Sequence, residues 1–479
     1  MPHNPGKAYL IGAGPGDPGL LTLRGRRLLG VADVVLYDYL ANPRILQYAR
    51  ADAELVCLGR HGAGRMLSQG EIAKRMIAEA RAGRIVARLK GGDPAIFGRT
   101  AEETAALEAA GIAYEIVPGV TSALAASSYA GIPLTHRAAA SCVALVTGQE
   151  CVGKAEGLDM EGLARFPGTL VFYMGVTSAP EWSAALVSHG KAADTPVAIV
   201  RHATLPGQQT VRTTLGELGG LVARTNLRPP ALIFVGPAVA QGPVQNWFAN
   251  RPLSGTTVMV TRPAHQADGL AETLESLGAG VVVQPAIEIG PPADWSAVDA
   301  AIAEMDRVQW IVFSSANGVR AFLDRIVAVG RDLRALGHVG IAAIGPATGA
   351  ALQEYHLRCD VQPEEYRAEA LAEALIPRAA GGRVLLVRAS RGRETLAEAL
   401  TRSGAEVVQA VAYERRDVRA PRAEAAAALA AGKIDWVTVT SSAIARSLAA
   451  MFGDALHRTK LAAISPLTAG VLQQAGYHV

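Results

Sequence analysis

Two glycine-rich loops, each directly after a strand-like run of apolar residues, constrain the fold of this chain most. The first covers residues 12–18 (GAGPGDP) after the run 8–11, and the second covers residues 88–99 (RLKGGDPAIFGR) after the run 84–87. Glycines let a ligand approach the backbone closely, and each Asp-Pro pair adds a carboxylate and stiffens the exit. Two such loops at the carboxyl ends of strands predict a small-molecule cleft in an α/β domain.

The first loop departs from the fingerprint of a dinucleotide-binding site. Gly12 and Gly14 match the first two glycines of that fingerprint, but Asp17 stands where the third is needed. Pro15 also lacks the N–H that would help to bind a pyrophosphate. The loop therefore argues against a nicotinamide cofactor.

Further segments carry a more specific signal. They follow in order along the chain: 35–40 (VLYDYL), 117–122 (VPGVTS), 130–137 (AGIPLTHR), 169–174 (TLVFYM) and 228–233 (RPPALI). With the two loops, they make residues 6–245 resemble the uroporphyrinogen-III C-methyltransferases of the tetrapyrrole methylase family. The resemblance implies a two-lobed α/β fold in residues 1–245, S-adenosyl-L-methionine as methyl donor, and a homodimer formed through this half.

Length and composition narrow the class of protein. At roughly 150 residues a unit, 479 residues suggest about three globular units. The net charge of +3, without a basic block, argues against a nucleic-acid or membrane-surface partner. The four cysteines are scattered, which predicts reduced thiols and no metal site. Because no signal peptide or long apolar run is evident, we expect a cytoplasmic protein.

An internal repeat follows a Gly- and Pro-rich boundary at residues 241–255. Residues 258–262 and 277–282 recur as 384–388 and 403–408, residues 310–315 recur as 436–441, and residues 342–348 recur as 462–468. Each copy alternates short apolar strands with helical segments, so each predicts a parallel α/β unit.

This doubled pattern makes residues 255–479 resemble uroporphyrinogen-III synthase. The resemblance implies a first subdomain of residues 255–287 plus 415–479 and a second of residues 288–414, with crossings near 285–289 and 411–415. It also implies a last loop and helix beyond a strand that begins near residue 476. The two halves together imply a bifunctional enzyme that cyclises hydroxymethylbilane to uroporphyrinogen III and methylates it at C2 and C7 to precorrin-2. Two alternatives are a synthase-like half that only binds tetrapyrroles and a methylase of a later corrinoid precursor.

The resemblance assigns the methyl donor to a set of residues in the first half. They are Pro15, Gly91, Gly92, Asp93, Ile96, Thr121, Ser122, Met174 and Ala203. Asp93 suits a ribose or amino group as an acceptor. Met174 suits adenine as a soft wall, although a methionine here is also typical of ordinary core. Ala203 stands where the family has glycine, so a backbone contact there requires a negative φ.

The predicted catalytic residue of this half is Asp38. By resemblance it is the general base that removes a proton from the methylated macrocycle; the alternative is a carboxylate that caps the next helix. The family's partner lysine falls at Arg60, which cannot easily release a proton and is expected to clamp a substrate carboxylate. Further basic residues expected to hold substrate carboxylates are Arg88, Lys90 and Arg137.

In the second half, the resemblance places Tyr413 at the cleft. It could hydrogen-bond the hydroxyl that leaves hydroxymethylbilane, or it could be structural. Hydroxyls expected at paired strand ends, where they could hold substrate carboxylates, are Ser315, Thr348, Ser441 and Thr468.

Overall fold

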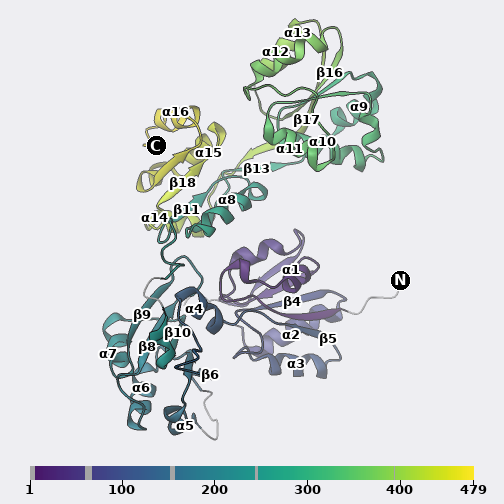
Figure 1. Cartoon of the computed structure of the whole chain (residues 1–479). Coiled ribbons are helices and arrows are strands. Elements are labelled where there is room, and N and C mark those ends of the chain that lie inside the picture. The colour runs from purple at the N-terminus through teal and green to yellow at the C-terminus, as the bar shows by residue number, and fades with distance from the viewer. Residues whose placement is uncertain (1–5, 60–66, 151–156, 243–245, 393) are drawn as a thin grey trace. The chain divides into compact units, whose positions relative to one another are not determined.

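The computed structural model describes residues 6–59, 67–150, 157–242, 246–392 and 394–479. The chain divides into two compact units, one of Met1–Thr256 with Leu274–Gly280 and one of Thr257–Thr273 with Val281–Val479 (Figure 1). Within the described residues, no helix is both long and apolar enough to span a membrane.

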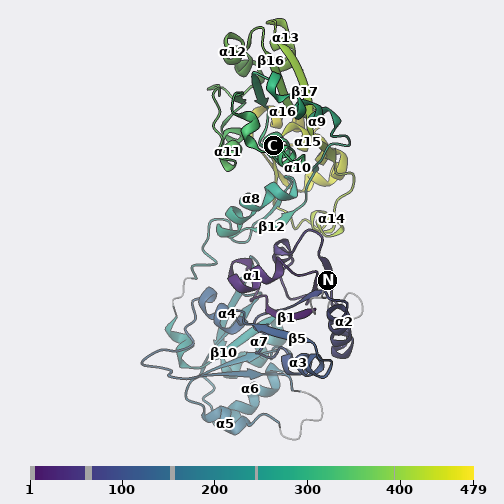
Figure 2. The ribbon, with the colours of Figure 1, turned by 90° about the vertical axis from the view of Figure 1, so that its right-hand side faces the viewer.

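The first lobe is a parallel sheet with helices on both faces. Its strand order is β3-β2-β4-β1-β5. The strands are β1 (Lys7–Gly12), β2 (Val34–Tyr37), β3 (Glu54–Cys57), β4 (Ile85–Lys90) and β5 (Ala113–Val117). Helix α1 (Leu23–Leu29) packs on one face, and α2 (Gln69–Arg81) and α3 (Thr100–Ala109) pack on the other (Figures 1 and 2). The apolar strands are therefore buried on both sides, as parallel strands usually are.

The second lobe is a mixed sheet of order β6-β7-β10-β8-β9, in which β6 and β7 are parallel and the other pairs antiparallel. The strands are β6 (Val143–Thr147), β7 (Thr169–Tyr173), β8 (Pro196–Arg201), β9 (Gln209–Thr214) and β10 (Ala231–Val235). Helix α4 (Ser122–Ala130) contributes to the core on one face. Helices on the other face are α5 (Met160–Arg165), α6 (Ala179–Ser188) and α7 (Leu215–Thr225).

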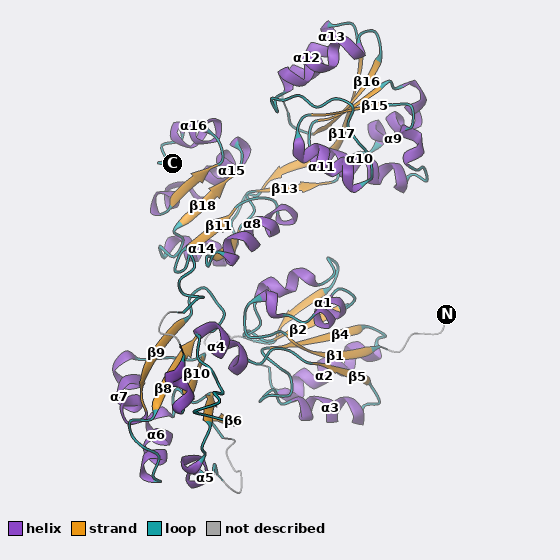
Figure 3. Cartoon of the chain, in the orientation of Figure 1, coloured by secondary structure: helices purple, strands orange, loops and turns teal. Residues whose placement is uncertain are grey.

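The second unit contains two sheets. The first has the order β12-β11-β18-β19, and the second has the order β13-β17-β16-β14-β15. The strands are β11 (Thr257–Val260), β12 (Gly280–Val283), β13 (Ile287–Gly290), β14 (Trp310–Phe313), β15 (Gly340–Ala343), β16 (Arg383–Ala389), β17 (Glu406–Asp417), β18 (Trp436–Val439) and β19 (Lys460–Ala463). The chain therefore leaves the first sheet, builds the second, and returns to complete the first. Strands β13 and β17 pair antiparallel, so the two predicted crossings form one two-stranded connection (Figure 3).

The helices of this half repeat in the same order as the strands. They are α8 (Ala264–Ser276), α9 (Ser296–Ala303), α10 (Ala316–Ala328), α11 (Pro346–Glu354), α12 (Ala368–Ala379), α13 (Thr395–Arg402), α14 (Ala423–Ala430), α15 (Ser442–Phe452) and α16 (Pro466–Gln474). In each copy a strand leads into a helix capped by serine, Ser315 before α10 and Ser441 before α15.

Two local predictions in this half are wrong. Thr348 and Thr468 do not end strands, because α11 and α16 begin two residues earlier, at Pro346 and Pro466. The segment after Gly476 is not a strand either. Tyr477 instead folds back into the core of its subdomain, and its hydroxyl donates to the carbonyl oxygen of Gly453 at 3.2 Å.

Candidate functional site

Three loops of the first lobe meet through glycines at the carboxyl edge of the sheet. A Cβ on Gly12 would lie 2.6 Å from the Cα of Gly119, and a Cβ on Gly119 would lie 2.3 Å from the oxygen of Gly92. Gly14 and Gly92 also exchange N–H···O bonds of 3.1 and 2.7 Å. The loops after β1, β4 and β5 are thus in backbone contact, which a side chain at Gly12 or Gly119 would prevent.

Asp93 braces this arrangement. Its Oδ1 accepts from the N–H of Ala95 at 2.7 Å, and its Oδ2 accepts from the N–H of Gly119 at 3.0 Å. The carboxylate therefore ties the second glycine loop to the loop that precedes α4. Direct binding of the methyl donor by Asp93 stays a prediction, and its observed role is to hold these two loops together.

The first glycine loop is tied to the second lobe and to α4. The N–H of Asp17 donates to Thr204 Oγ1 at 3.0 Å, and Asp17 Oδ2 accepts from the hydroxyl of Tyr129 at 2.7 Å. Burial, and then the neighbouring Asp17 carboxylate, raise the pKa of Tyr129, so the phenol keeps its proton and acts as the donor. The second lobe and its helix α4 thus hold the first glycine loop at two points.

A second contact between the lobes lies at Thr121. Its Oγ1 is 2.7 Å from the hydroxyl of Tyr173, which also accepts from the N–H of Ala123 at 3.1 Å. The ring of Phe97, from the second glycine loop, lies 4.9 Å from that of Tyr173, centroid to centroid. Ile96 and Ala203 pack against the same core. The other residues predicted to bind the methyl donor lie nearby in the sequence. Pro15 is in the first glycine loop, Gly91 precedes Gly92, and Ser122 is the first residue of α4.

Backbone strain gathers in the same place. Seven described residues other than glycine have positive φ, and five lie in or next to the segments described above: Phe97, Arg99, Met174, His202 and Thr204. Such conformations are costly and collect at functional sites. Met174 is 49 % exposed, so the alternative that it is ordinary core is wrong. Ala203 does not have a positive φ, so its backbone meets the requirement that arises from alanine standing where the family has glycine.

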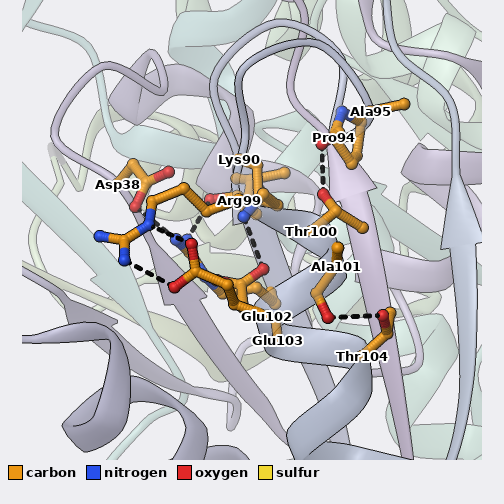
Figure 4. Close-up of polar contacts among 12 residues, drawn as sticks. Asp38, Lys90, Pro94, Ala95, Arg99, Thr100, Ala101, Glu102, Glu103 and Thr104 are labelled. Carbon is orange, nitrogen blue, oxygen red and sulfur yellow. Dashed lines mark hydrogen bonds and ion pairs between the residues drawn. The ribbon is translucent and has the colours of Figure 1, made fainter. Parts of the chain in front are cut away.

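Asp38 is the first of four charged side chains that are linked by ion pairs. Arg88 donates from Nη2 to Asp38 Oδ1 at 2.7 Å and from Nε to Glu103 Oε1 at 3.0 Å. The other oxygen of Glu103 accepts from Lys90 Nζ at 2.5 Å, the ion pair drawn in Figure 4. The side chains of Arg88, Lys90 and Glu103 are at most 3 % exposed, whereas that of Asp38 is 32 % exposed.

These contacts correct two predictions. Arg88 and Lys90 were expected to clamp substrate carboxylates, but both are buried and their charges are engaged by Glu103 and Asp38. Burial, and then the Arg88 cation, lower the pKa of Lys90. The alternative that Asp38 caps a helix is also wrong, because the next helical turn is capped by Asn42, whose side chain accepts from the N–H of Arg44.

The remaining basic candidates stand apart from these contacts. Arg60 lies outside the described residues. Arg137 is exposed in the turn closed by the bridge between His136 and Ala140, and its role in binding substrate stays a prediction.

The second unit brings Ser315 and Tyr413 together. Their hydroxyl oxygens lie 2.9 Å apart, and Arg415 Nη2 donates to the phenol at 3.3 Å. Ser441, the counterpart of Ser315, caps α15 through the N–H of Ile444. The two other predicted binders, Thr348 and Thr468, are at most 4 % exposed inside their helices, so their predicted contact with substrate has little surface available.

Sequence reasoning missed several residues of these sites. Tyr173 ends a strand inside a segment already singled out, so its position was the available signal. Glu103 follows Glu102 on α3, and the sequence does not tell which of the two faces the core. Tyr129 and Thr204 carry no local signal. Among the described residues, no cluster of three or more His, Cys, Asp or Glu side chains could hold a metal ion.

Two family models match the chain. Residues 7–219 match the tetrapyrrole (corrin/porphyrin) methylases, and residues 268–479 match uroporphyrinogen-III synthase HemD. A relative from Ruminiclostridium josui, named porphyrin biosynthesis protein HemD, is 33 % identical over 450 residues, covering 94 % of this chain and 89 % of the relative.

Other relatives match the first half. The S-adenosyl-L-methionine-dependent uroporphyrinogen III methyltransferase of Methanosarcina barkeri is 45 % identical and covers 50 % of this chain and 94 % of its own length. A crystal structure of uroporphyrin-III C-methyl transferase from Thermus thermophilus is 40 % identical, covers 49 % of this chain and 99 % of its own, and has a TM-score of 0.43. The chain spans about half the length of the siroheme synthases that it matches. These matches place the chain in the family of porphyrin biosynthesis proteins that join a tetrapyrrole methylase to a uroporphyrinogen-III synthase.

Proposed function

We propose that the chain is a bifunctional enzyme that cyclises hydroxymethylbilane to uroporphyrinogen III and then methylates this product at C2 and C7, giving precorrin-2. The two family matches and the names of the relatives support this assignment. The single observation that carries the methylation step is the geometry of Asp38, a partly exposed carboxylate held by an arginine that is 2 % exposed.

The first half carries the residues that the family uses for S-adenosyl-L-methionine, the proposed methyl donor. The loops that hold most of them are joined by backbone contacts at Gly12, Gly92 and Gly119. Met174 is exposed and has a positive φ. The donor supplies an electrophilic methyl carbon to the macrocycle. The residues that would hold it are Pro15, Gly91, Gly92, Asp93, Ile96, Thr121, Ser122, Met174 and Ala203.

Asp38 would act as the general base. Arg88 donates to its Oδ1 and orients the carboxylate, and Oδ2 has no hydrogen-bond partner among the described residues. That oxygen is therefore available to take the proton that the methylated carbon framework releases. The carboxylate lies at the carboxyl end of β2, the edge at which ligands bind in open parallel sheets.

The second half would cyclise the linear tetrapyrrole. Loss of the terminal hydroxyl gives a reactive azafulvene, which closes through a spiro intermediate that inverts the last ring. The protein has to hold the chain in a closing conformation and exclude simple head-to-tail closure. Ser315 and Ser441, which begin helices directly after strands, offer hydroxyls for this purpose.

The methylation step is tested by Asp38→Asn. Loss of a general base is expected to lower the methylation rate about 10²–10⁴-fold, while the affinity for S-adenosyl-L-methionine stays unchanged. Methyl transfer to uroporphyrinogen III and titration calorimetry of the donor give the two readouts. Asp52→Asn, which removes an exposed carboxylate paired with Arg50, serves as the matched control. Near-normal turnover of Asp38→Asn would leave Asp38 with a structural role only.

A further inference from the structure

The buried phenol of Tyr413 has two hydrogen-bonding neighbours, Arg415 and Ser315. Tyr413 and Arg415 lie two residues apart on β17, and Ser315 is the N-cap of α10. Arg415 Nη2 lies 3.3 Å and Ser315 Oγ 2.9 Å from the phenol oxygen. Ser315 Oγ also accepts from the N–H of Gly318 at 3.1 Å. All four residues lie on β17 or at the start of α10, within one compact unit, so the arrangement does not depend on how the two units are placed.

The direction of the bond between Tyr413 and Ser315 follows from counting protons. A guanidinium can only donate, so the phenol oxygen accepts from Arg415. Tyr413 is 2 % exposed, and Ser315 is its remaining partner among the described residues. If Ser315 donated to Tyr413, the phenol proton would be buried without an acceptor, which costs more than losing a hydrogen bond. The phenol therefore donates to Ser315.

This direction leaves Ser315 with one free proton. Its oxygen accepts from Tyr413 and from the N–H of Gly318, and these two bonds occupy both lone pairs of a hydroxyl. Its own O–H then points away from both donors. Unlike Tyr413, Ser315 is only half-buried, and it lies at the carboxyl end of β14. Both acceptor bonds also polarise the hydroxyl, because hydrogen bonds in a chain strengthen one another.

We propose that Ser315, and not Tyr413, is the catalytic hydrogen-bond donor of the cyclisation, with Tyr413 and Arg415 as positioning residues. This inference rests on the proposed synthase function of the second half. Ser315 would donate to the terminal hydroxyl oxygen of the bilane as its C–O bond breaks. The oxygen leaves with the electron pair and takes up the proton released from the pyrrole N–H, so water and the azafulvene are formed and Ser315 keeps its proton.

Ser441 offers a matched comparison within the same chain. It caps α15 as Ser315 caps α10, and its Oγ accepts from the N–H of Ile444 at 3.2 Å. No phenol donates to it among the described contacts. Ser315→Ala and Ser441→Ala therefore remove the same kind of helix cap and should lower the melting temperature of this half alike, but only Ser315→Ala removes the polarised donor.

The test measures uroporphyrinogen isomers formed by the full chain from hydroxymethylbilane. Ser315→Ala is expected to lower kcat for isomer III about 10²-fold, with Ser315→Thr restoring most of it. Tyr413→Phe is expected to lower kcat about tenfold or less with KM unchanged, the effect of one hydrogen bond. Ser441→Ala should lower kcat less than Ser315→Ala does. The melting temperature of the second half, measured on the same samples, checks that each variant is folded, and methylation of supplied uroporphyrinogen III checks that the first half is unaffected.

Two outcomes would overturn the inference. If Tyr413→Phe lowered kcat as much as Ser315→Ala, the phenol itself would be the donor. If Ser315→Ala raised KM and left kcat unchanged, Ser315 would bind a substrate carboxylate. Failure of the proposed function is distinct from both, since the wild-type chain would then yield isomer I alone.

Discussion

Arg88 is the residue on which the buried charges of the first lobe converge. It donates to Glu103, to Asp38 and to the carbonyl oxygen of Leu89, using three of its nitrogens. A lysine has no planar fork and could not hold these groups together. Glu103 in turn forms ion pairs with both Arg88 and Lys90. Asp38, the proposed base, is therefore oriented by a buried ion-pair network.

Glu103→Gln is expected to destabilise the first lobe by about 3–5 kcal/mol, because two buried cations lose their shared carboxylate. The methylation rate should fall as well, since Arg88 no longer holds Asp38 in one direction. Glu102→Gln is the matched control: its carboxylate pairs with Arg99 on the surface, so its loss should change stability by about 1 kcal/mol or less. Urea unfolding measures both. Equal effects of the two variants would contradict a role for the buried charges.

The stability of the first unit is expected to depend on pH through His202. Burial, and then the neighbouring Arg201 cation, lower the pKa of His202 below its ordinary value of 6.5. In the window between the lowered pKa and 6.5, the unfolded chain binds the proton and the folded chain does not. Stability contributed by neutral His202 is therefore present above that window and is lost as the pH falls through it.

The free energy of unfolding is thus expected to fall when the pH is lowered from about 7.5 to about 5.5, and part of that fall should disappear in His202→Gln. Denaturant unfolding at both pH values measures the difference. A variant whose pH dependence equals that of the wild type would show that His202 does not titrate between the two states.

At the scale of elements, the segment after residue 245 is anchored on α4 beside the first glycine loop. Phe248 is 3 % exposed, and its ring lies 4.8 Å from that of Tyr129. The indole N–H of Trp247 donates to the carbonyl oxygen of Ser128 at 3.0 Å. Because Tyr129 also donates to Asp17, one residue links this segment to the loop of the proposed donor site.

Phe248→Ala is expected to cost about 3–5 kcal/mol of stability, since a buried ring is lost. It should also weaken binding of S-adenosyl-L-methionine, because Tyr129 loses the packing that aims it at Asp17. Trp247→Ala is the control: that ring is 54 % exposed, so a smaller effect on both quantities is expected. Unchanged donor affinity in a destabilised Phe248→Ala protein would show that the segment and the loop are not coupled.

The elements also show what the sequence can and cannot predict. The α/β fold could be predicted from the two glycine loops and the repeat, because both are visible as patterns of residues along the chain. Thr348 and Thr468 were expected at strand ends but lie inside helices. Pro346 and Pro466 were the available signal, because proline favours the first position of a helix. The buried ion-pair partner of Arg88 could not be predicted from the sequence, because the rotation of α3 about its axis decides whether Glu102 or Glu103 is buried.

At the scale of the whole molecule, each candidate site is built within one compact unit. Asp38 and its partners lie in the first unit, and Ser315 and Tyr413 lie in the second. We therefore expect variants in one site to leave the other activity unchanged. The homodimer formed through the first half stays a prediction.

Whether one chain carries out both reactions can be measured by supplying hydroxymethylbilane to the purified protein with and without S-adenosyl-L-methionine. Without S-adenosyl-L-methionine, we expect uroporphyrinogen III as the product, and with it the dimethylated product precorrin-2. Because hydroxymethylbilane closes spontaneously to isomer I, product composition reports on each half separately. Isomer I alone would contradict the synthase assignment, and isomer III that stays unmethylated in the presence of the donor would contradict the methylase assignment.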